Sequence, residues 1–271
     1  MPDGRVLLTG ASGLLGTWLR RTSPADTELV GVTHRTRLAG CREVAADLRD
    51  ANAVVAAVRE VRPSLVIHAA YAHDRASIVE ATRHVVAAVR RIGADVLFVS
   101  TDAVFSGDGA PRHEDAPPDP IADYGRWKAE AERIVTEGSQ SATIVRLPLI
   151  VSLDPDDHVV AQIRRGAAMN TPTVWFDDEV RQPAAAAELA EALWRIVSVD
   201  RADRTGVWHL PGPERLSRYQ IAQRVVAALD LDPGSISAEH TPPSTRRPRH
   251  IDLEDGRART QIAWSPSPIL C

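Results

Sequence analysis

A glycine-rich turn near the start of the chain constrains the fold more than any other feature. It reads Thr-Gly-Ala-Ser-Gly-Leu-Leu-Gly over residues 9–16, after the apolar run 5–8 and before apolar residues at helical spacing. The order strand, glycine turn, helix is the context of a dinucleotide site. Gly10 permits a tight exit from the strand, Gly13 lets the backbone approach a pyrophosphate, and Gly16 permits close helix–sheet packing. The phosphates would bind free N–H groups at the helix start.

Strand-like and helix-like segments alternate along most of the chain. The predicted strands are residues 6–9, 29–32, 65–69, 96–100 and 143–146, and the predicted helices include residues 51–61, 78–92 and 218–229. Such alternation indicates an α/β protein with a doubly wound parallel sheet of the Rossmann type. The alternation weakens after residue 149, which predicts a second, smaller lobe. The proline-rich and acidic segment 108–123 is predicted to be a loop over the mouth of the site.

The residues after the second strand indicate which dinucleotide binds. A site selective for NAD usually places an acidic residue there, to hold the ribose 2′-hydroxyl. This chain instead has His34, Arg35 and Arg37. Guanidinium groups bind a 2′-phosphate through charge-assisted hydrogen bonds, whereas a carboxylate would repel it. The predicted cofactor is therefore NADP(H), and the alternative is a solvated basic loop.

Tyr124 and Lys128 lie four residues apart in a helix-forming segment, so both side chains would share one helix face. A tyrosine hydroxyl needs a nearby positive charge to exchange a proton readily near neutral pH. Thr101 follows a buried-type strand, at the end where open parallel sheets bind ligands, and its hydroxyl could hydrogen-bond a substrate carbonyl. Ser100 is predicted to support Thr101 from the neighbouring position. The alternative is that these hydroxyls form an ordinary Ser/Thr cap of a turn.

These motifs resemble the extended short-chain dehydrogenase/reductase superfamily, because the glycines are spaced Gly-x-x-Gly-x-x-Gly. A closer resemblance, to the dTDP-4-dehydrorhamnose reductase family, spans nearly the whole chain. It is carried by His-Ala-Ala-Tyr at 68–71, Ser-Thr-Asp-Ala-Val-Phe-Ser-Gly at 100–107, Tyr-Gly-Arg-Trp-Lys at 124–128, Arg-Gln-Pro at 181–183 and Arg-Pro at 247–248.

The resemblance implies roles for further residues and a division of the chain. The implied catalytic residues are Thr101, Tyr124 and Lys128. The implied or predicted cofactor contacts are Gly10, Ser12, Gly13, Leu14, Leu15, Gly16, His34, Arg35, Arg37, Asp47, Leu48, Ala69, Ala70, Tyr71, Ser100, Tyr124 and Lys128. The substrate contacts would be Asp102, Ala103, Val104, Phe105 and Arg247. Residues 1–149 and 182–210 would form the NADP-binding domain, and 150–181 and 211–271 the substrate-binding lobe.

The implied activity is reduction, by NADPH, of a keto group on a nucleotide-linked deoxysugar, with Tyr124 as proton donor. Two positions depart from the family pattern, since Ala103 replaces its tyrosine and Glu80 stands where an asparagine is usual. An epimerase or dehydratase on the same scaffold is an alternative, although a dehydratase would carry Glu at position 103. A non-catalytic NADP-binding regulatory subunit is the alternative from another class. Arg247 could bind a diphosphate or belong to a solvated basic turn.

Composition limits the partners. The 271-residue chain has a formal net charge of −4, which gives no reason to expect nucleic acid or an anionic membrane as a partner. Cys41 and Cys271 form no disulfide framework, and no metal-ligand spacing is present. No signal-type start and no membrane-spanning run is seen. We therefore expect a cytoplasmic protein whose partner is a nucleotide sugar, with a homodimer as one option for its assembly.

Overall fold

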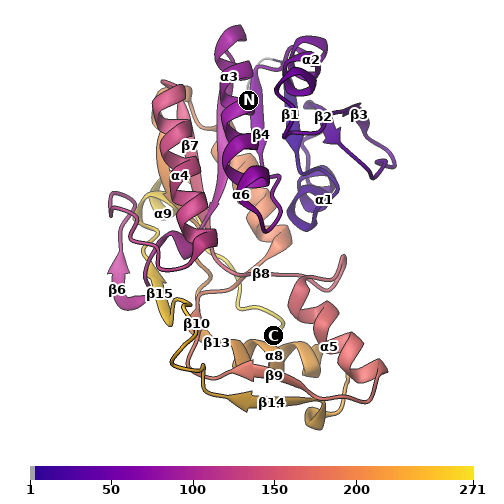
Figure 1. Ribbon diagram of the computed structural model, residues 1–271, viewed down its shortest axis with the longest axis vertical. Coiled ribbons are helices and arrows are strands. Elements are labelled where there is room, and N and C mark those ends of the chain that lie inside the picture. Colours follow the sequence, from indigo (N-terminus) through magenta and orange to yellow (C-terminus); the bar gives the residue numbers. More distant parts are fainter. Residues whose placement is uncertain (1–3) are drawn as a thin grey trace.

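The computed structural model describes residues 4–271, so the first three residues of the predicted NADP-binding domain lie outside the described part. A large α/β unit lies above a smaller lobe, and the chain crosses between them several times (Figure 1). The C-terminus lies at the boundary between the two (Figure 1).

The large unit is built on one seven-stranded sheet. Its strands, in spatial order, are β12 (Gly206–His209), β7 (Ala142–Leu147), β5 (Asp95–Thr101), β4 (Leu65–His68), β1 (Arg5–Thr9), β2 (Glu28–Thr33) and β3 (Arg42–Ala45). Every neighbouring pair is parallel. The chain order reverses between β1 and β4, the switch point at which open sheets of this kind bind ligands. The predicted α/β fold class is confirmed.

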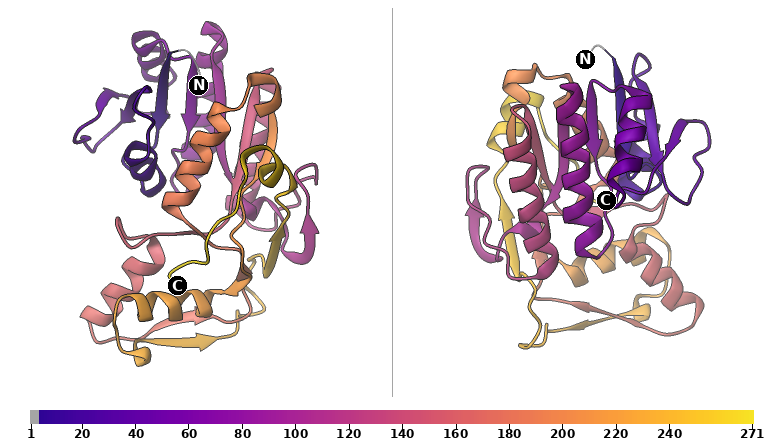
Figure 2. Two further views of the ribbon diagram at one scale, coloured as in Figure 1. Left: turned by 180° about the vertical axis from the view of Figure 1, so that it is seen from behind. Right: turned by 45° about the horizontal axis from the view of Figure 1, so that its top comes forward.

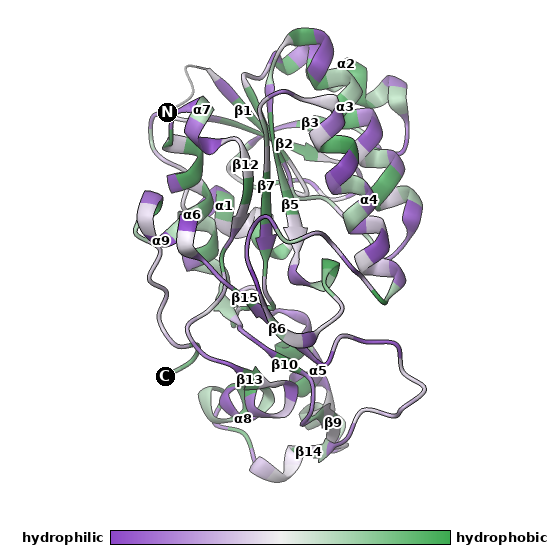
Figure 3. Cartoon of the chain, turned by 90° about the vertical axis from the view of Figure 1, so that its left-hand side faces the viewer, coloured by the Kyte–Doolittle hydropathy of each residue, from purple (hydrophilic) through white to green (hydrophobic). Residues whose placement is uncertain are grey.

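Helices cover both faces of this sheet, as Figure 2 shows from two sides. On one face lie α2 (Ala51–Val61), α3 (Ala81–Ile92) and α4 (Asp123–Gly138), and on the other lie α1 (Leu14–Arg21), α6 (Ala186–Ser198) and α9 (Gly256–Ile262). Two clusters of buried aliphatic side chains fill the two interfaces. On β5 the side chains alternate, since Val96 and Phe98 join the α2–α4 cluster while Leu97 and Val99 join the other. Figure 3 shows the resulting apolar strands between amphipathic helices.

The smaller lobe has a core of its own, between α5 (His158–Ala168) and α8 (Arg218–Ala228). A four-stranded sheet joins the lobe to the large unit, in the order β13 (Leu216–Ser217), β10 (Val180–Arg181), β15 (His250–Leu253) and β6 (Asp108–Arg112). Two-stranded pairs are β14 (Ile236–Glu239) with β9 (Thr173–Phe176), and β11 (Ala184–Ala185) with β8 (Ile150–Val151). The remaining elements are the short helix α7 (Arg201–Arg204), the π-helical turn η1 (Ala76–Glu80) and the 3-10 turns η2 (Asp102–Val104) and η3 (Pro233–Ser235).

Three features differ from the sequence-based expectations or extend them. The predicted loop 108–123 contains strand β6, because residues 108–112 pair with the distant strand β15. Strand β3 was not predicted at all. The segment 256–264 packs Ala258, Ile262 and Trp264 into the core beside α1 and α6. The predicted division assigned residues 256–264 to the smaller lobe, whereas this packing places them against the nucleotide-binding unit.

Over residues 4–271, the helices are all too short or too polar to cross a membrane. Cys41 and Cys271 are both free thiols.

Leu97 tests the packing of the central strand, because its side chain is fully buried in the cluster facing α1 and α6. We expect Leu97→Ala to lower the free energy of unfolding by about 2–5 kcal/mol, the usual cost of such a core cavity. Ile92→Ala is the control, since Ile92 is 40% exposed at the end of α3. Urea denaturation of both variants measures the difference, and equal losses would contradict this assignment of the core.

Candidate active site

The glycine turn between β1 and α1 brings two backbone segments into contact. Gly10 has a φ of +72°, and a Cβ added there would lie 2.8 Å from the backbone of Ala69 and Ala70, which follow β4. A Cβ on Gly16 would overlap the carbonyl oxygen of Gly10. Gly13 begins α1 without a side-chain cap, so the first N–H groups of the helix have no partner from a cap. The turn is therefore a cradle that could hold phosphates.

The predicted cofactor residues of this turn lie together at the carboxyl end of the sheet. They are Gly10, Ser12, Gly13, Leu14, Leu15 and Gly16, with Ala69 and Ala70 beneath them. The end of β4 is fixed by a buried hydrogen-bonded chain. His68 Nδ1 lies 2.7 Å from Thr9 Oγ1, and its Nε2 lies 3.0 Å from Thr82 Oγ1.

The hydrogen bonds around His68 determine its tautomer. Thr82 Oγ1 donates to the carbonyl of Ile78, so it accepts the His68 Nε2 proton. His68 Nδ1 then accepts from Thr9, which in turn accepts from the N–H of Ala70. Burial and the charge of Lys128 lower the pKa of His68 to about 3, so the ring is neutral. His68 is therefore a packing residue rather than an acid.

The predicted adenosine-end residues lie after β2 and β3. Asp47 accepts two hydrogen bonds from the Arg49 guanidinium, at 3.0 and 2.7 Å, and His34 Nδ1 lies 3.5 Å away. These hydrogen bonds to Arg49 hold the pKa of Asp47 well below its usual range. Leu48 is partly buried against the α2–α3 core, and its carbonyl contacts His84.

The two predicted phosphate-binding arginines differ in their surroundings. Arg37 is exposed and faces the Glu43 carboxylate of β3 at 3.5 Å. Arg35 is also exposed, and within residues 4–271 its guanidinium has neither a hydrogen bond nor an ion pair. Arg35 is therefore the better placed of the two to accept an added anion, such as a 2′-phosphate.

Helix α4 places Tyr124 and Lys128 beside the end of β5, where Thr101 lies. Lys128 is buried, donates to the carbonyl of Val99 at 2.9 Å, and has its Nζ 4.7 Å from the Phe98 ring centroid. Burial lowers the pKa of Lys128 to about 8, opposed by the charge of Glu132. Lys128 is also the only lysine among the 32 Lys and Arg residues of the chain. An ammonium group, which is compact and can lose its proton, is therefore found only here.

Tyr124 lies in an environment that keeps its hydroxyl protonated. Burial raises its pKa, the Tyr71 and Asp102 charges add to the effect, and a hydrogen bond with Thr101 opposes it. The rings of Tyr71 and His73 stand 6.0 and 5.8 Å from the Tyr124 ring, between centroids. Tyr71 is 53% exposed, so it forms an accessible wall beside Tyr124. A protonated phenol in this position can act as a general acid.

The predicted substrate contacts in and after the 3-10 turn η2 differ in burial. Asp102 is buried with its Oδ2 3.8 Å from Arg181 Nε, and burial raises its pKa. Ala103 is partly exposed. Val104 and Phe105, by contrast, are fully buried in a small apolar cluster with β15. Both side chains are core residues, so a substrate contact at Val104 or Phe105 would have to involve the main chain, and the expected contacts stay predictions.

The side chain of Ser100 also points into the protein interior. Its hydroxyl is buried and donates to Glu132 Oε1 at 2.5 Å. Glu132 also forms a two-contact ion pair with Arg146 of β7, at 3.1 and 2.8 Å. The Ser100 hydroxyl therefore has a structural partner on α4, because side chains alternate along β5 and position 100 faces α4, and its expected cofactor contact stays a prediction.

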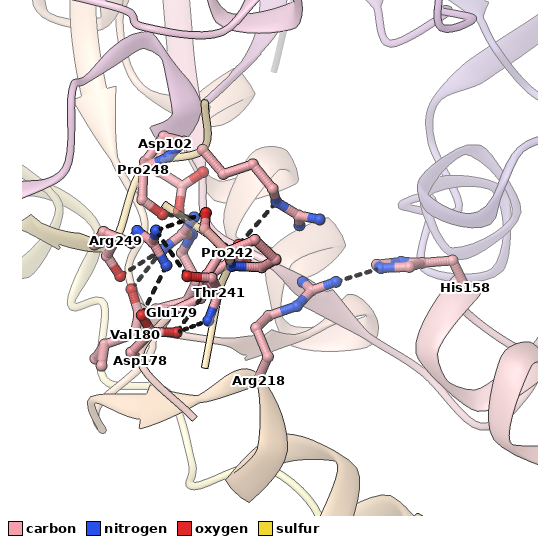
Figure 4. A network of polar contacts seen from close by, with 12 residues as sticks. Asp102, His158, Asp178, Glu179, Val180, Arg218, Thr241, Pro242, Pro248 and Arg249 are labelled. Atoms are coloured by element: carbon pink, nitrogen blue, oxygen red, sulfur yellow. Dashed lines mark hydrogen bonds and ion pairs between the residues drawn. The ribbon is translucent and has the colours of Figure 1, made fainter. Parts of the chain in front are cut away.

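A second group of charged residues lies where the smaller lobe meets the turn after β5 (Figure 4). Arg181 of β10 donates to the carbonyls of Val180, Pro248 and Arg249, so its Nη groups are committed to holding the loop before β15. Its remaining Nε faces Asp102. Arg181 therefore connects the lobe to the turn that carries Thr101.

Arg218 and Arg247 keep donors available, unlike Arg181. One Nη of Arg218 lies 3.0 Å from His158 Nε2, and Arg247 Nε lies 2.9 Å from the buried Glu179 carboxylate. In the described chain Arg218 makes no other side-chain hydrogen bond, and Arg247 makes none, since its contact with Glu179 is an ion pair only. Burial and the nearby Arg218 lower the pKa of His158 to about 4, so its ring is neutral. The Arg218 and Arg247 guanidiniums thus keep unpaired N–H groups that suit an anion.

Arg218 and His158 were missed by the sequence analysis. Each is the first residue of its helix, α8 and α5, and follows a capping residue, Ser217 or Asp157. Helix N-termini attract anions, so the two caps were a detectable signal, but nothing in the sequence placed them side by side.

One group of possible metal ligands, Asp177, Asp178 and His240, meets on the smaller lobe. Its members already have partners, since His240 contacts Asp177 and Asp178 binds Thr241 and Arg249. These contacts hold a surface loop of the smaller lobe in place.

Comparison with known proteins places the chain in a family. A family model described as the RmlD substrate binding domain matches residues 4–268. The dTDP-4-dehydrorhamnose reductase of Streptomyces griseus is 31% identical over 274 positions, covering 94% of this chain and 87% of that protein. The beta subunit of methionine adenosyltransferase 2 from Bos taurus is 26% identical over 280 positions, covering 96% and 83%.

A solved structure described with the name of one of these relatives has a similar fold. A crystal structure described as a hypothetical dTDP-4-dehydrorhamnose reductase from Sulfolobus tokodaii superposes with a TM-score of 0.83 at 26% identity, covering 98% of this chain and 97% of that chain.

The buried ammonium of Lys128 predicts a pH effect on stability. Its pKa falls from 10.5 to about 8 on folding. The unfolded chain therefore binds more protons than the folded protein between these values, and stability from this group rises with pH there, by at most about 1.4 kcal/mol per pH unit. Relative to Lys128→Met, the wild type should gain stability from pH 8 to pH 10. Denaturant titrations measure this difference, and a constant difference would contradict the assigned burial.

Proposed function

This chain belongs to the RmlD substrate binding domain family, and on that premise we propose that it is an NADPH-dependent reductase acting on a keto group of a nucleotide-linked deoxysugar. The proposal rests on one observation: Thr101, Tyr124 and Lys128 lie together at the carboxyl end of the sheet. They stand between the glycine turn after β1 and the guanidiniums of Arg218 and Arg247, so a sugar bound between these two places would lie against Tyr124.

The cradle fits a dinucleotide. Gly10 and Gly16 leave no room for a Cβ, and the uncapped start of α1 offers N–H groups to a pyrophosphate. Arg35, unpaired beyond β2, supports NADP(H) over NAD(H). Lys128 uses one N–H on the Val99 carbonyl, which leaves two for ribose hydroxyls.

Each residue of the site has a defined task in the proposed reaction. NADPH, when bound, supplies the hydride that adds to the carbonyl carbon. Thr101 donates a hydrogen bond to the carbonyl oxygen as negative charge develops there. Tyr124 transfers its hydroxyl proton to that oxygen, which completes the alcohol. The environment that raises the pKa of Tyr124 ensures that this proton is present at neutral pH.

The free guanidinium donors support a diphosphate as the part of the substrate that the smaller lobe binds. Arg218 and Arg247 keep free N–H donors, and a guanidinium binds phosphate oxygens in pairs. Arg247, left open by the sequence, is therefore assigned to the substrate in this proposal.

We expect Tyr124→Phe to retain NADPH binding and to lose about 10²–10⁴-fold in kcat, because the proton donor is removed while the ring still packs. The measurement is NADPH oxidation with a panel of nucleotide-linked ketosugars. Tyr219→Phe is the control, since Tyr219 packs in the core of the smaller lobe. Near-normal turnover by Tyr124→Phe on an active substrate would refute the assigned proton donor.

Cofactor choice is tested at Arg35. We expect wild type to bind NADPH more tightly than NADH, and Arg35→Ala to lose about ten- to a hundredfold of that preference, the worth of one charge-assisted contact. Arg91→Ala, an exposed arginine at the far end of α3, is the control. Titrations of both cofactors give the ratio. Equal affinities in the wild type would contradict the NADP(H) assignment.

A second candidate function follows from the similarity to a methionine adenosyltransferase 2 beta subunit over 96% of the chain. In that case the protein would be an NADP-binding subunit of another enzyme. Binding of NADPH without turnover of any ketosugar nucleotide would favour this function. An epimerase or dehydratase would instead regenerate its cofactor and show no net NADPH oxidation.

A further inference from the structure

The ammonium of Lys128 has few partners for a buried cation. Nζ has one hydrogen bond, to the carbonyl of Val99, and lies over the rings of Phe98 and Tyr71, at 4.7 and 5.4 Å from their centroids. Ring faces attract a cation only modestly. The titratable groups around it are His68 of β4, Tyr71 of the following loop, and Tyr124 and Glu132 of α4. Among these groups, His68 is neutral and Glu132 is the only carboxylate.

Glu132 is held rigidly, one helical turn beyond Lys128. It is buried, accepts from Ser100 at 2.5 Å, and is clamped by Arg146 Nε and Nη2 at 3.1 and 2.8 Å. Arg146 is itself buried and reaches His209 at 3.3 Å. A carboxylate fixed in this way keeps its charge at a constant distance from the ammonium, since residues four apart share a helix face.

We propose that Glu132 is a positioning residue of the site, which from its buried ion pair with Arg146 keeps Lys128 in its charged form and holds the end of β5 through Ser100. The catalytic hydroxyl of Thr101 directly follows Ser100, so one carboxylate fixes both the cation and the strand end. This inference rests on the proposed use of Lys128 to bind the cofactor.

The ion pair is removed as a unit in the test. Glu132→Gln alone would leave Arg146 as an uncompensated buried charge and could unfold the chain, whereas Glu132→Gln with Arg146→Met removes both charges and keeps a partner for Ser100. The matched control is Asp95→Asn with Arg204→Met. That pair, 2.6 Å apart, lies at the opposite end of the same strand β5.

Lys128 can be observed directly, because it is the only lysine in the chain. Labelling with ¹³C,¹⁵N-lysine gives a single side-chain NMR signal, whose pH titration reports the protonation of Lys128 without cofactor or turnover. We expect the titration of the Glu132/Arg146 double variant to move to lower pH by about half a unit to one unit, because the carboxylate that is lost acts on the ammonium from one helical turn away and outweighs the guanidinium that is lost with it. The Asp95/Arg204 control should titrate as wild type does.

NADPH binding supplies the second readout. With its ammonium less populated, the Glu132/Arg146 double variant should bind NADPH about two- to threefold more weakly than wild type at pH 7.5, and about as tightly as wild type at pH 6. A merely structural role would weaken binding equally at both pH values. An unchanged Lys128 titration in a folded double variant overturns the inference. Failure of wild type to bind NADPH overturns the proposed function instead, and leaves the NMR result to decide on Glu132.

Discussion

The contact on which the site depends is a backbone-to-backbone approach between the turn after β1 and the end of β4. No side chain separates them, because a Cβ on Gly10 would lie 2.8 Å from Ala70. The Thr9–His68–Thr82 hydrogen bonds then fix β4 relative to β1 and α3. The approach sets where α1 starts, and so where its N–H groups point. It also determines how close a ligand on that turn comes to Tyr124.

The sequence predicted the parts of the molecule that depend on local pattern. Buried parallel strands read as continuous apolar runs, so β1, β2, β4, β5 and β7 were found. Tyr124 and Lys128 were placed on one helix face by their spacing alone, and α4 confirms that they share a helix. The resemblance in these motifs was confirmed by the family match over residues 4–268.

The rest depends on contacts between distant segments. Strand β6 contains Gly109 and Pro111 and is extended only because it pairs with β15. Ser100 and Phe105 lie within the matching motif, yet they face the protein interior, which the alternation along β5 decides for Ser100 and the contact with β15 for Phe105. The assignments of individual cofactor and substrate contacts remain predictions.

The contact between Arg181 and Asp102 crosses from the smaller lobe to the large unit, at 3.8 Å. Asp102 also contributes to the electric field at the Tyr124 hydroxyl. Moving the smaller lobe away from the large unit would lengthen this contact and leave Asp102 without the cation that faces it. The charge balance beside Tyr124 therefore depends on where β10 is held, although β10 and α4 are far apart in the sequence.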